Sequence, residues 1–230
     1  NSNDYPFEEN IQMTVFTKEN KFPLHLRIPS WCKNPKLTIN VEKEEIKVND
    51  RGFAVINRTW KSGDKIKLSF PKTIKVIQGR ETGYPEVSYF HELDGVRRIA
   101  KTSKEINNPY SSVIYGPLLF AYPIPDQGPN TPQLTVPYNF ALNLNPVNPE
   151  DKVKIINNDM PEHWHWQLNN PPIQIKVPAS QFNWEPSALQ PLPSMPVKNG
   201  EDTSIILVPY NLTKFRISMF PVNAASWDNK

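Results

Sequence analysis

Alternation of apolar and polar residues with a period of two is the feature that most constrains the fold of this sequence. In residues 22–28, for example, Leu24 and Leu26 are separated by His25. Because successive side chains of a β-strand point to opposite faces, this pattern predicts strands with one apolar and one wet face. Their recurrence, about every 10 residues in the first part of the chain, is typical of a sandwich or barrel. Strands are predicted at 11–15, 22–28, 37–41, 46–48, 53–55, 66–70, 74–76, 87–90, 96–100, 140–144, 153–155, 164–168, 173–177, 205–208 and 215–219.

Proline supports the same fold class. The chain has 25 Pro against 8 Gly, and proline is confined to strand starts, edges and loops because it lacks the amide donor of a β-ladder. No 3.6-residue pattern extends beyond about two helical turns. We therefore predict an all-β protein of two antiparallel, jelly-roll-like β-sandwich modules with little or no helix.

The module boundary is predicted from five prolines within residues 123–137. This stretch has no periodicity and reads as a stiff linker. It separates a first sandwich, residues 1–122, from a second, residues 138–220, which a tail at 221–230 follows. The apolar run 113–122 lacks alternation, which predicts one strand buried on both faces.

Composition excludes several function classes. The net charge is +3 with no block of like charges, so nucleic-acid binding is not indicated. No apolar run reaches the roughly 18 residues of a membrane span. Cys32 is the single cysteine, which excludes an internal disulfide and a cysteine-based zinc site. We interpret the start at Asn1 as processed or truncated.

Several motifs together resemble a known family. Their order and spacing are similar to those of glycoside hydrolase family 127, the β-L-arabinofuranosidase family, over most of residues 5–122 and about 160–220. One departure is Asn211-Leu212, where members of that family tend to have Gly-Cys. The motifs are Tyr5-Pro6-Phe7-Glu8-Glu9, the segment 22–32, Thr59-Trp60-Lys61-Ser62-Gly63-Asp64, Tyr115-Gly116-Pro117-Leu118-Leu119, Leu207-Val208-Pro209-Tyr210 and the segment 213–217.

The resemblance implies a non-catalytic role for this chain. Proteins of that family place an (α/α)6 barrel before one or two β-sandwich domains, and the barrel carries the catalytic cysteine, the general acid/base glutamate and a zinc ion. None of the barrel motifs can be placed here, so the resemblance assigns no catalytic residue, metal site or cofactor to this chain. It implies the upstream barrel as partner, with a homodimer contact as a further option.

Cys32 is the one candidate nucleophile. A catalytic cysteine needs a base or cation that lowers its pKa. Lys33 is adjacent, and His25 lies on the preceding strand. We favour a structural role for this cysteine.

The segment around residue 164 holds the candidate sugar-binding residues. In a strand, Trp164 and Trp166 would share one face, and His163 and His165 the other. The tryptophans could stack on a sugar or fill the core. The histidines could bind a metal with a third ligand or simply face water. The core and the wet face are the favoured alternatives.

The acidic residues of the irregular region are less informative. A glycosidase needs two carboxyl groups flanking the scissile bond, and sequence spacing cannot establish such a pair. Arg97 and Arg98 supply nearby counter-ions. The carboxylates concerned are Glu81, Glu86, Glu92 and Asp94.

Three functions stay open. The first is an accessory region that braces the barrel of a bacterial glycosidase acting on plant-type glycans, arabinofuranosides in particular, in the periplasm or outside the cell. The second is a stand-alone carbohydrate-binding module, which would need exposed aromatics. The third is a structural or adhesion sandwich without a ligand.

Overall fold

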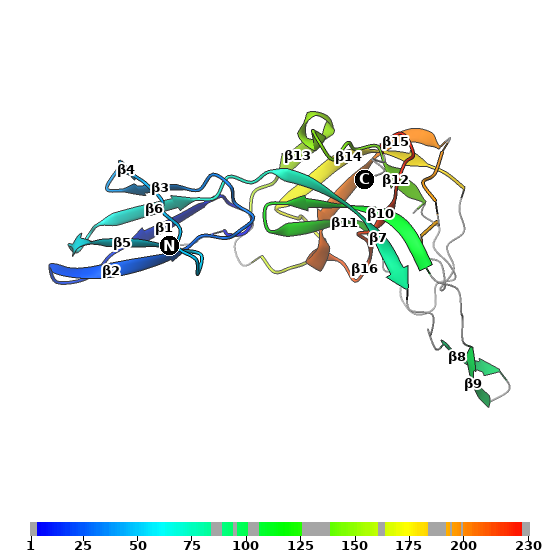
Figure 1. Ribbon diagram of the computed structural model, residues 1–230, viewed down its shortest axis with the longest axis horizontal. Helices are drawn as coiled ribbons and strands as arrows, with labels where there is room; N and C mark the ends of the chain where they lie inside the picture. Colours follow the sequence, from blue (N-terminus) through cyan, green and yellow to red (C-terminus); the bar gives the residue numbers. More distant parts are fainter. Residues whose placement is uncertain are drawn as a thin grey trace. The chain divides into compact units, whose positions relative to one another are not determined.

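The computed structural model describes residues 4–83, 89–93, 96–100, 106–125, 139–160, 164–183, 192–193, 195–198 and 200–226. The chain divides into unit 1, Asn1–Ile74 with Tyr115–Leu118, and unit 2, Lys75–Ile114 with Leu119–Lys230 (Figure 1). In the described residues, helical structure is limited to the short 3-10 helices η1 (Pro149–Lys152) and η2 (Tyr210–Leu212). The predicted all-β class is confirmed. No helix in these ranges has the length and hydropathy to cross a membrane.

Unit 1 contains two antiparallel sheets. The larger has the order β1-β6-β3-β4, and β2 pairs with β5 in the smaller. The turn Tyr115–Leu118 belongs to this unit, where Gly116 N donates to Thr73 O (3.2 Å) and Lys72 Nζ lies 5.0 Å from the centre of the Tyr115 ring. The strands are β1 (Asn10–Thr14), β2 (Asn20–Arg27), β3 (Lys36–Ile39), β4 (Glu42–Glu44), β5 (Phe53–Trp60) and β6 (Lys65–Ser69).

The apolar faces of both sheets meet in one core. Trp60 is fully buried at the end of β5, and its indole Nε1 donates to Phe22 O (3.1 Å). The wet faces alternate as predicted, because His25 and Arg27 are exposed while Leu26 is buried. The core comprises Leu26, Ile28, Cys32, Leu37, Ile39, Ala54, Trp60, Ile66, Leu68 and Phe70.

Side-chain hydrogen bonds close two turns of unit 1. Asp64 Oδ2 accepts from Lys61 N (2.9 Å), closing a turn in which Gly63 has φ +94°. Asn49 Oδ1 accepts from Phe53 N (3.0 Å), and Gly52 follows with φ +79°. A Cβ on Gly52 would displace the mobile end of the Arg27 side chain, and the positive φ is what favours glycine there.

The strand predicted at residues 46–48 is wrong. The chain turns directly after β3 through the two residues Asn40 (φ +50°) and Val41 (φ +74°), so β4 begins at Glu42. Val48 makes only an isolated bridge to Ala54. Two consecutive positive φ values fit a tight hairpin turn, for which Asn-Gly is the usual signal. The Asn-Val pair carries a weaker signal, which explains the error.

Unit 2 is built on one large sheet. Its order is β12-β14-β15-β11-β10-β17, with β13 on β14, β16 on β11 and β7 on β10 (Figure 1). A separate ladder joins β8 and β9. The strands are β7 (Ile74–Gly83), β8 (Tyr89–Leu93), β9 (Val96–Ala100), β10 (Ile106–Tyr115), β11 (Leu118–Ile124), β12 (Phe140–Leu142), β13 (Lys154–Asn157), β14 (Ile173–Gln181), β15 (Glu201–Pro209), β16 (Phe215–Ile217) and β17 (Phe220–Pro221).

The observed division differs from the predicted modules 1–122 and 138–220. Strands β10 and β11 pair with strands near the end of the chain, for example Tyr110 with Pro221 and Phe120 with Pro209. These pairings place most of residues 75–122 in unit 2. Most of the predicted linker 123–137 lies outside the described residues, and Pro123 and Ile124 end β11.

Two further predictions in this region are corrected. The apolar run 113–122 is the meeting point of two strands, β10 and β11, because Gly116 (φ +57°) turns the chain. The predicted tail at 221–230 is ordered at its start: Pro221 and Val222 are buried, and Val222 bridges Leu142. Sequence alternation reports neither a turn within an apolar run nor a distant strand partner.

Some of the buried side chains of unit 2 are polar. Among the described residues, the buried polar side chains are Asn108, Ser111, Ser112 and Ser180.

Ser180 is the buried member of a hydrogen-bond network that extends to the exposed Asp202. Its Oγ accepts from Asn143 Nδ2 (2.7 Å) and donates to Asp202 Oδ1 (3.0 Å). Asn223 Nδ2 donates to Asn143 Oδ1 (2.7 Å). The network therefore links β14 and β15 to the segment after β17.

Candidate functional site

The connection between β13 and β14 carries the predicted aromatic residues. The two strands pair up to Asn157 and Ile173. Just beyond, Asn158 N donates to Pro172 O (2.9 Å) and its Nδ2 donates to Pro171 O (2.7 Å). Both prolines are buried. These bonds and the fixed φ of proline close the base from which residues 164–170, hereafter the aromatic loop, extend.

The aromatic loop is not the predicted strand. Residues 164–170 form no ladder, so the alternation of Trp164, Trp166 and Leu168 does not reflect a pleated sheet. Asn170 has φ +50°, a left-handed conformation that ends extended structure and that asparagine tolerates. The Asn-Asn-Pro-Pro sequence at 169–172 is the turn signal that contradicts a strand here.

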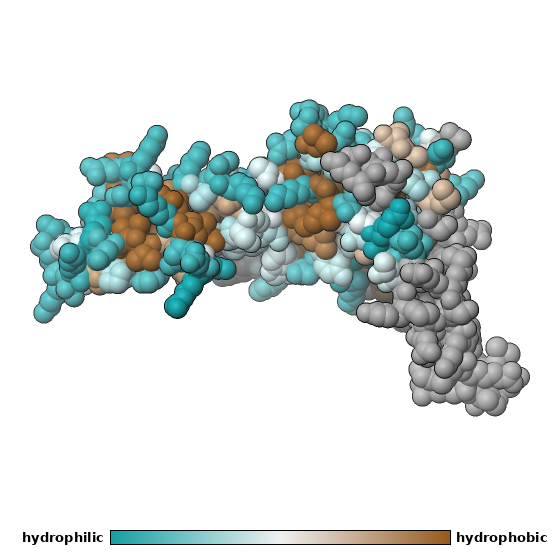
Figure 2. All heavy atoms as spheres, in the orientation of Figure 1, coloured by the Kyte–Doolittle hydropathy of each residue, from teal (hydrophilic) through white to brown (hydrophobic). Residues whose placement is uncertain are grey.

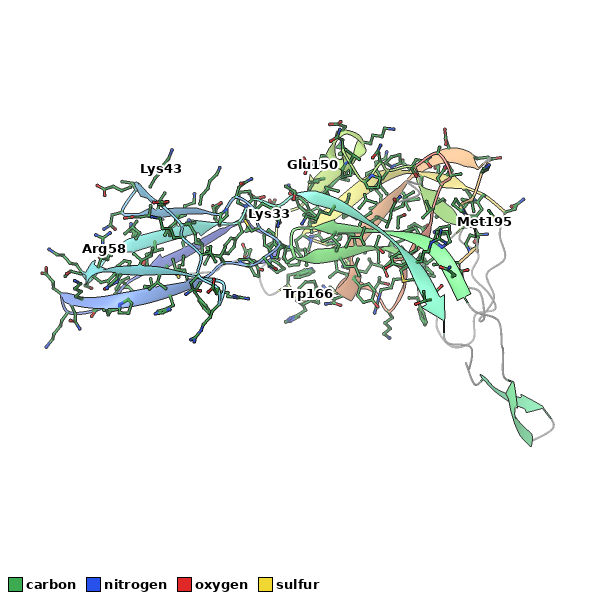
Figure 3. The ribbon with its side chains drawn as sticks, viewed as in Figure 1. Lys33, Lys43, Arg58, Glu150, Trp166 and Met195 are labelled. Carbon is green, nitrogen blue, oxygen red and sulfur yellow. The ribbon has the colours of Figure 1, made fainter. Side chains whose placement is uncertain are left out.

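The two indole rings nevertheless lie together. Their centroids are 5.7 Å apart and their planes are inclined by 51°, within the range of favourable aromatic pairs. The Trp166 side chain is 47% exposed, whereas Trp164 is half-buried. Figure 3 shows Trp166 at the edge of unit 2, on a connection between strands. The core interpretation therefore does not hold for Trp166.

The rest of the aromatic loop is polar and uncharged. His165, Gln167, Asn169 and Asn170 are exposed, as is Leu168. Amide and imidazole groups both donate and accept hydrogen bonds. An indole face bordered by such groups can contact the C–H face of a sugar ring while its neighbours bind hydroxyl groups.

The histidine pair is only partly described. His165 is exposed, and His163 lies outside the described residues. Within the described ranges, no group of three His, Cys, Asp or Glu side chains is placed to hold a metal ion. The sugar-binding roles of Trp164, Trp166, His163 and His165 stay predictions.

Cys32 lies in the core of unit 1. It is only 6% exposed, and its Sγ lies 3.9 Å from Pro71 O. Burial raises the pKa of the Cys32 thiol, an effect that a hydrogen bond from the backbone at Asn34 opposes and that Glu9 reinforces. A cysteine nucleophile needs the opposite shift.

Among the four acidic candidates, only Glu81 has a described side chain. Glu81 is half-buried on β7. Nothing is described of the side chain of Glu92, and Glu86 and Asp94 lie outside the described residues. No carboxyl pair of glycosidase geometry can be drawn from this region.

Sequence reasoning missed the parts that hold the aromatic loop. Asn158, Pro171 and Pro172 form its base, yet none resembles a ligand-binding residue in sequence. The Pro-Pro pair at the start of β14 is the available signal, because proline tends to precede strands and to end loops.

Comparison with known proteins places unit 1 in a family context. Residues 1–72 match the family model described as beta-L-arabinofuranosidase, GH127 middle domain. This match confirms the resemblance found in the sequence. It covers nearly the whole of the first segment of unit 1. No curated protein sequence matches the chain.

Solved structures share the fold of the chain. A GH127 beta-L-arabinofuranosidase from Geobacillus stearothermophilus T6 is 24% identical with a TM-score of 0.55, over 96% of this chain and 29% of its own. A glycoside hydrolase is 21% identical with a TM-score of 0.58, over 96% and 32%. A GH127 beta-arabinofuranosidase is 18% identical with a TM-score of 0.55, over 99% and 32%. The chain thus spans about three tenths of the length of these proteins.

Proposed function

We propose that this chain is the non-catalytic β region of a glycoside hydrolase acting on plant-type glycans, arabinofuranosides in particular. The observation that carries the proposal is the match of residues 1–72 to the GH127 middle domain. A middle domain belongs to a larger protein, and the chain corresponds to about three tenths of the matched glycosidases. In this proposal, the β region braces a catalytic (α/α)6 barrel, which holds the zinc ion and the reacting groups.

The chemistry of unit 1 supports the non-catalytic role. Cys32 is the only cysteine, and it is buried with a raised pKa. It therefore stays a thiol near neutral pH, whereas nucleophilic catalysis needs the thiolate.

The test compares this chain with the full-length gene product that contains it. Both are assayed with p-nitrophenyl β-L-arabinofuranoside under identical conditions. We expect turnover by the full-length protein and none by the chain alone. Turnover by the purified chain would overturn the proposal. The Cys32→Ala variant of the full-length protein is the control, and it should keep the activity of the unmodified enzyme if the protein remains folded.

A stand-alone carbohydrate-binding module is the alternative. The exposed Trp166 beside Trp164 is the observation that favours it. The gene distinguishes the two functions. An accessory region requires that the same open reading frame also encode a catalytic barrel, whereas a stand-alone module does not. A structural or adhesion role without a ligand would show neither turnover by the longer protein nor glycan binding by the chain.

A further inference from the structure

The aromatic loop combines three properties that bear on ligand binding. The first is a pair of large aromatic side chains in contact, with one of them substantially exposed. Exposing part of an indole to water forgoes hydrophobic stabilisation that a ligand stacked on it would recover.

The second property is a well-supported base. Asn158 donates two hydrogen bonds across it, to the carbonyl oxygens of Pro171 and Pro172. Pro172 directly precedes β14, whose first residue, Ile173, is 1% exposed. A loop held in this way presents its side chains with less loss of conformational entropy on binding than a free loop.

The third property is charge. Residues 164–172 contain no Lys, Arg, Asp or Glu, and the charged residues elsewhere in the connection between β13 and β14, Asp159 and Glu162, are both acidic. Their polar groups are the amides of Gln167, Asn169 and Asn170 and the imidazole of His165. Phosphate or carboxylate ligands are usually bound by Arg or Lys, so this composition favours a ligand without charge.

We propose that the aromatic loop binds a neutral glycan, with the indole of Trp166 against the C–H face of a sugar ring and the neighbouring amides toward its hydroxyl groups. The inference shares with the proposed function only the class of ligand. It does not require that the longer protein hydrolyse an arabinofuranoside.

A protein partner is the competing occupant of an exposed aromatic side chain. The hydrophobic surface of the chain does not single out this loop, because apolar residues also reach the visible face over both units (Figure 2). Phe16, at 83% exposure in unit 1, is more exposed than Trp166. The aromatic loop exposes Leu168 as well, at 39%. What distinguishes this connection is its amide content together with the absence of Lys and Arg.

The experiment measures binding of the intact 230-residue chain to soluble polysaccharides by affinity electrophoresis and by quenching of tryptophan fluorescence. The probes are a debranched arabinan and an arabinoxylan as neutral glycans, and polygalacturonate as an acidic one. We expect retardation by at least one neutral glycan and none by polygalacturonate. Equal retardation by all three, or by polygalacturonate only, would overturn the inference.

Substitutions at Trp166 test whether the aromatic loop is the glycan-binding site. Trp166→Ala should weaken binding of the neutral glycan by about tenfold or more, which corresponds to about 1.4 kcal/mol. Trp166→Phe keeps an aromatic face and should retain most of the affinity. Phe16→Ala is the matched control, because it removes an exposed aromatic side chain elsewhere, and it should leave the affinity unchanged. Equal affinities of Trp166→Ala and the unmodified chain would contradict the assignment.

A melting experiment distinguishes a loss of binding from a loss of folding. Trp166 lies on a loop and is 47% exposed, so Trp166→Ala should lose the contact with Trp164 but still unfold cooperatively, which thermal melting followed by circular dichroism checks. Loss of glycan binding by this folded variant supports the inference whatever the hydrolysis assay gives. Turnover by the longer protein without glycan binding by the chain would overturn this inference and leave the proposed accessory role standing.

Discussion

Unit 1 and unit 2 are both antiparallel β structures, yet their interiors are constructed differently. The core of unit 1 is apolar, with Trp60 at its centre and Cys32 as its least hydrophobic member. The described interior of unit 2 contains hydroxyl and amide groups, and Ser180 connects three other polar residues there.

Both units pair strands that lie far apart in the sequence, and unit 2 does so over a longer separation. In unit 1, β1 pairs with β6, Asn10 facing Ser69. In unit 2, β10 pairs with β17, Tyr110 facing Pro221. A strand that pairs with a neighbour in sequence is positioned by its turn, whereas a distant segment must be selected by its contacts. The polar network of unit 2 supplies directional contacts of this kind, since hydrogen bonds specify geometry more sharply than apolar packing does.

Truncation of Trp60 should have the largest effect and tests how far unit 1 depends on its dry core. Trp60→Ala removes a fully buried indole and its bond to Phe22 O. We expect the free energy of unfolding to fall by about 3–5 kcal/mol, measured by urea denaturation. Trp166→Ala, the same substitution at a half-exposed position, should cost less, about 0.5–1.5 kcal/mol for the lost contact with Trp164. A small effect at Trp60 would show that unit 1 is not organised around this residue.

Removal of the Ser180 hydroxyl tests the polar interior of unit 2. Ser180→Ala deprives Asn143 and Asp202 of a buried partner. Asp202 is exposed, and Asn143 keeps its bonds to Asp202 and Asn223, so we expect only the loss of ordinary hydrogen bonds, about 0.5–1.5 kcal/mol. Ser204→Ala, at an exposed position on the adjacent strand, is the control. If both variants unfold at the same urea concentration, the network does not stabilise unit 2 and the contrast between the two units fails.

Replacement of Val41 should stabilise unit 1. Valine is β-branched, and it has φ +74° and 95% exposure at the turn between β3 and β4. Val41→Gly removes the steric cost of this conformation and loses no buried surface, so the free energy of unfolding should rise by about 1 kcal/mol. Val55→Gly, within a strand, should lower it instead. A lower melting temperature for Val41→Gly would mean that the valine side chain makes a contact that the turn geometry does not reveal.

The smallest effect concerns pH and the Cys32 thiol. Burial raises its pKa above the ordinary value of 9.0, so at more alkaline pH the unfolded chain loses the thiol proton while the folded chain keeps it. The folded state then binds more protons, and the free energy of unfolding falls as pH rises.

The matching measurement compares the unmodified chain with Cys32→Ala. The stability difference should be constant between pH 6 and 8 and should shrink above pH 9.0 in favour of the variant. A difference that grows with pH would mean that the thiolate is stabilised in the fold, which would restore Cys32 as a reactive group.

Local pattern predicted most strands but not their partners. The alternation around Leu24, Leu26 and Ile66 marked strands correctly, because a strand with one buried face needs a period of two. The same rule failed at Trp164–Leu168, where the residues alternate but Asn170 and the following prolines prevent a strand. The candidate aromatic residues were therefore identified from sequence, whereas their setting on a braced loop was not.

The sequence by itself determined the all-β class, and its motifs over most of residues 5–122 and about 160–220 carried the resemblance to a known glycosidase family. These features depend on neighbouring residues, whose geometry is set within a few peptide units. Only the tertiary structure decided that β10 and β11 join the end of the chain, that Val222 is buried and that Trp166 is exposed. Those outcomes depend on which distant segments pack together and exclude water. Many alternative contacts have similar energies, so no short stretch of sequence is enough to predict which of them form.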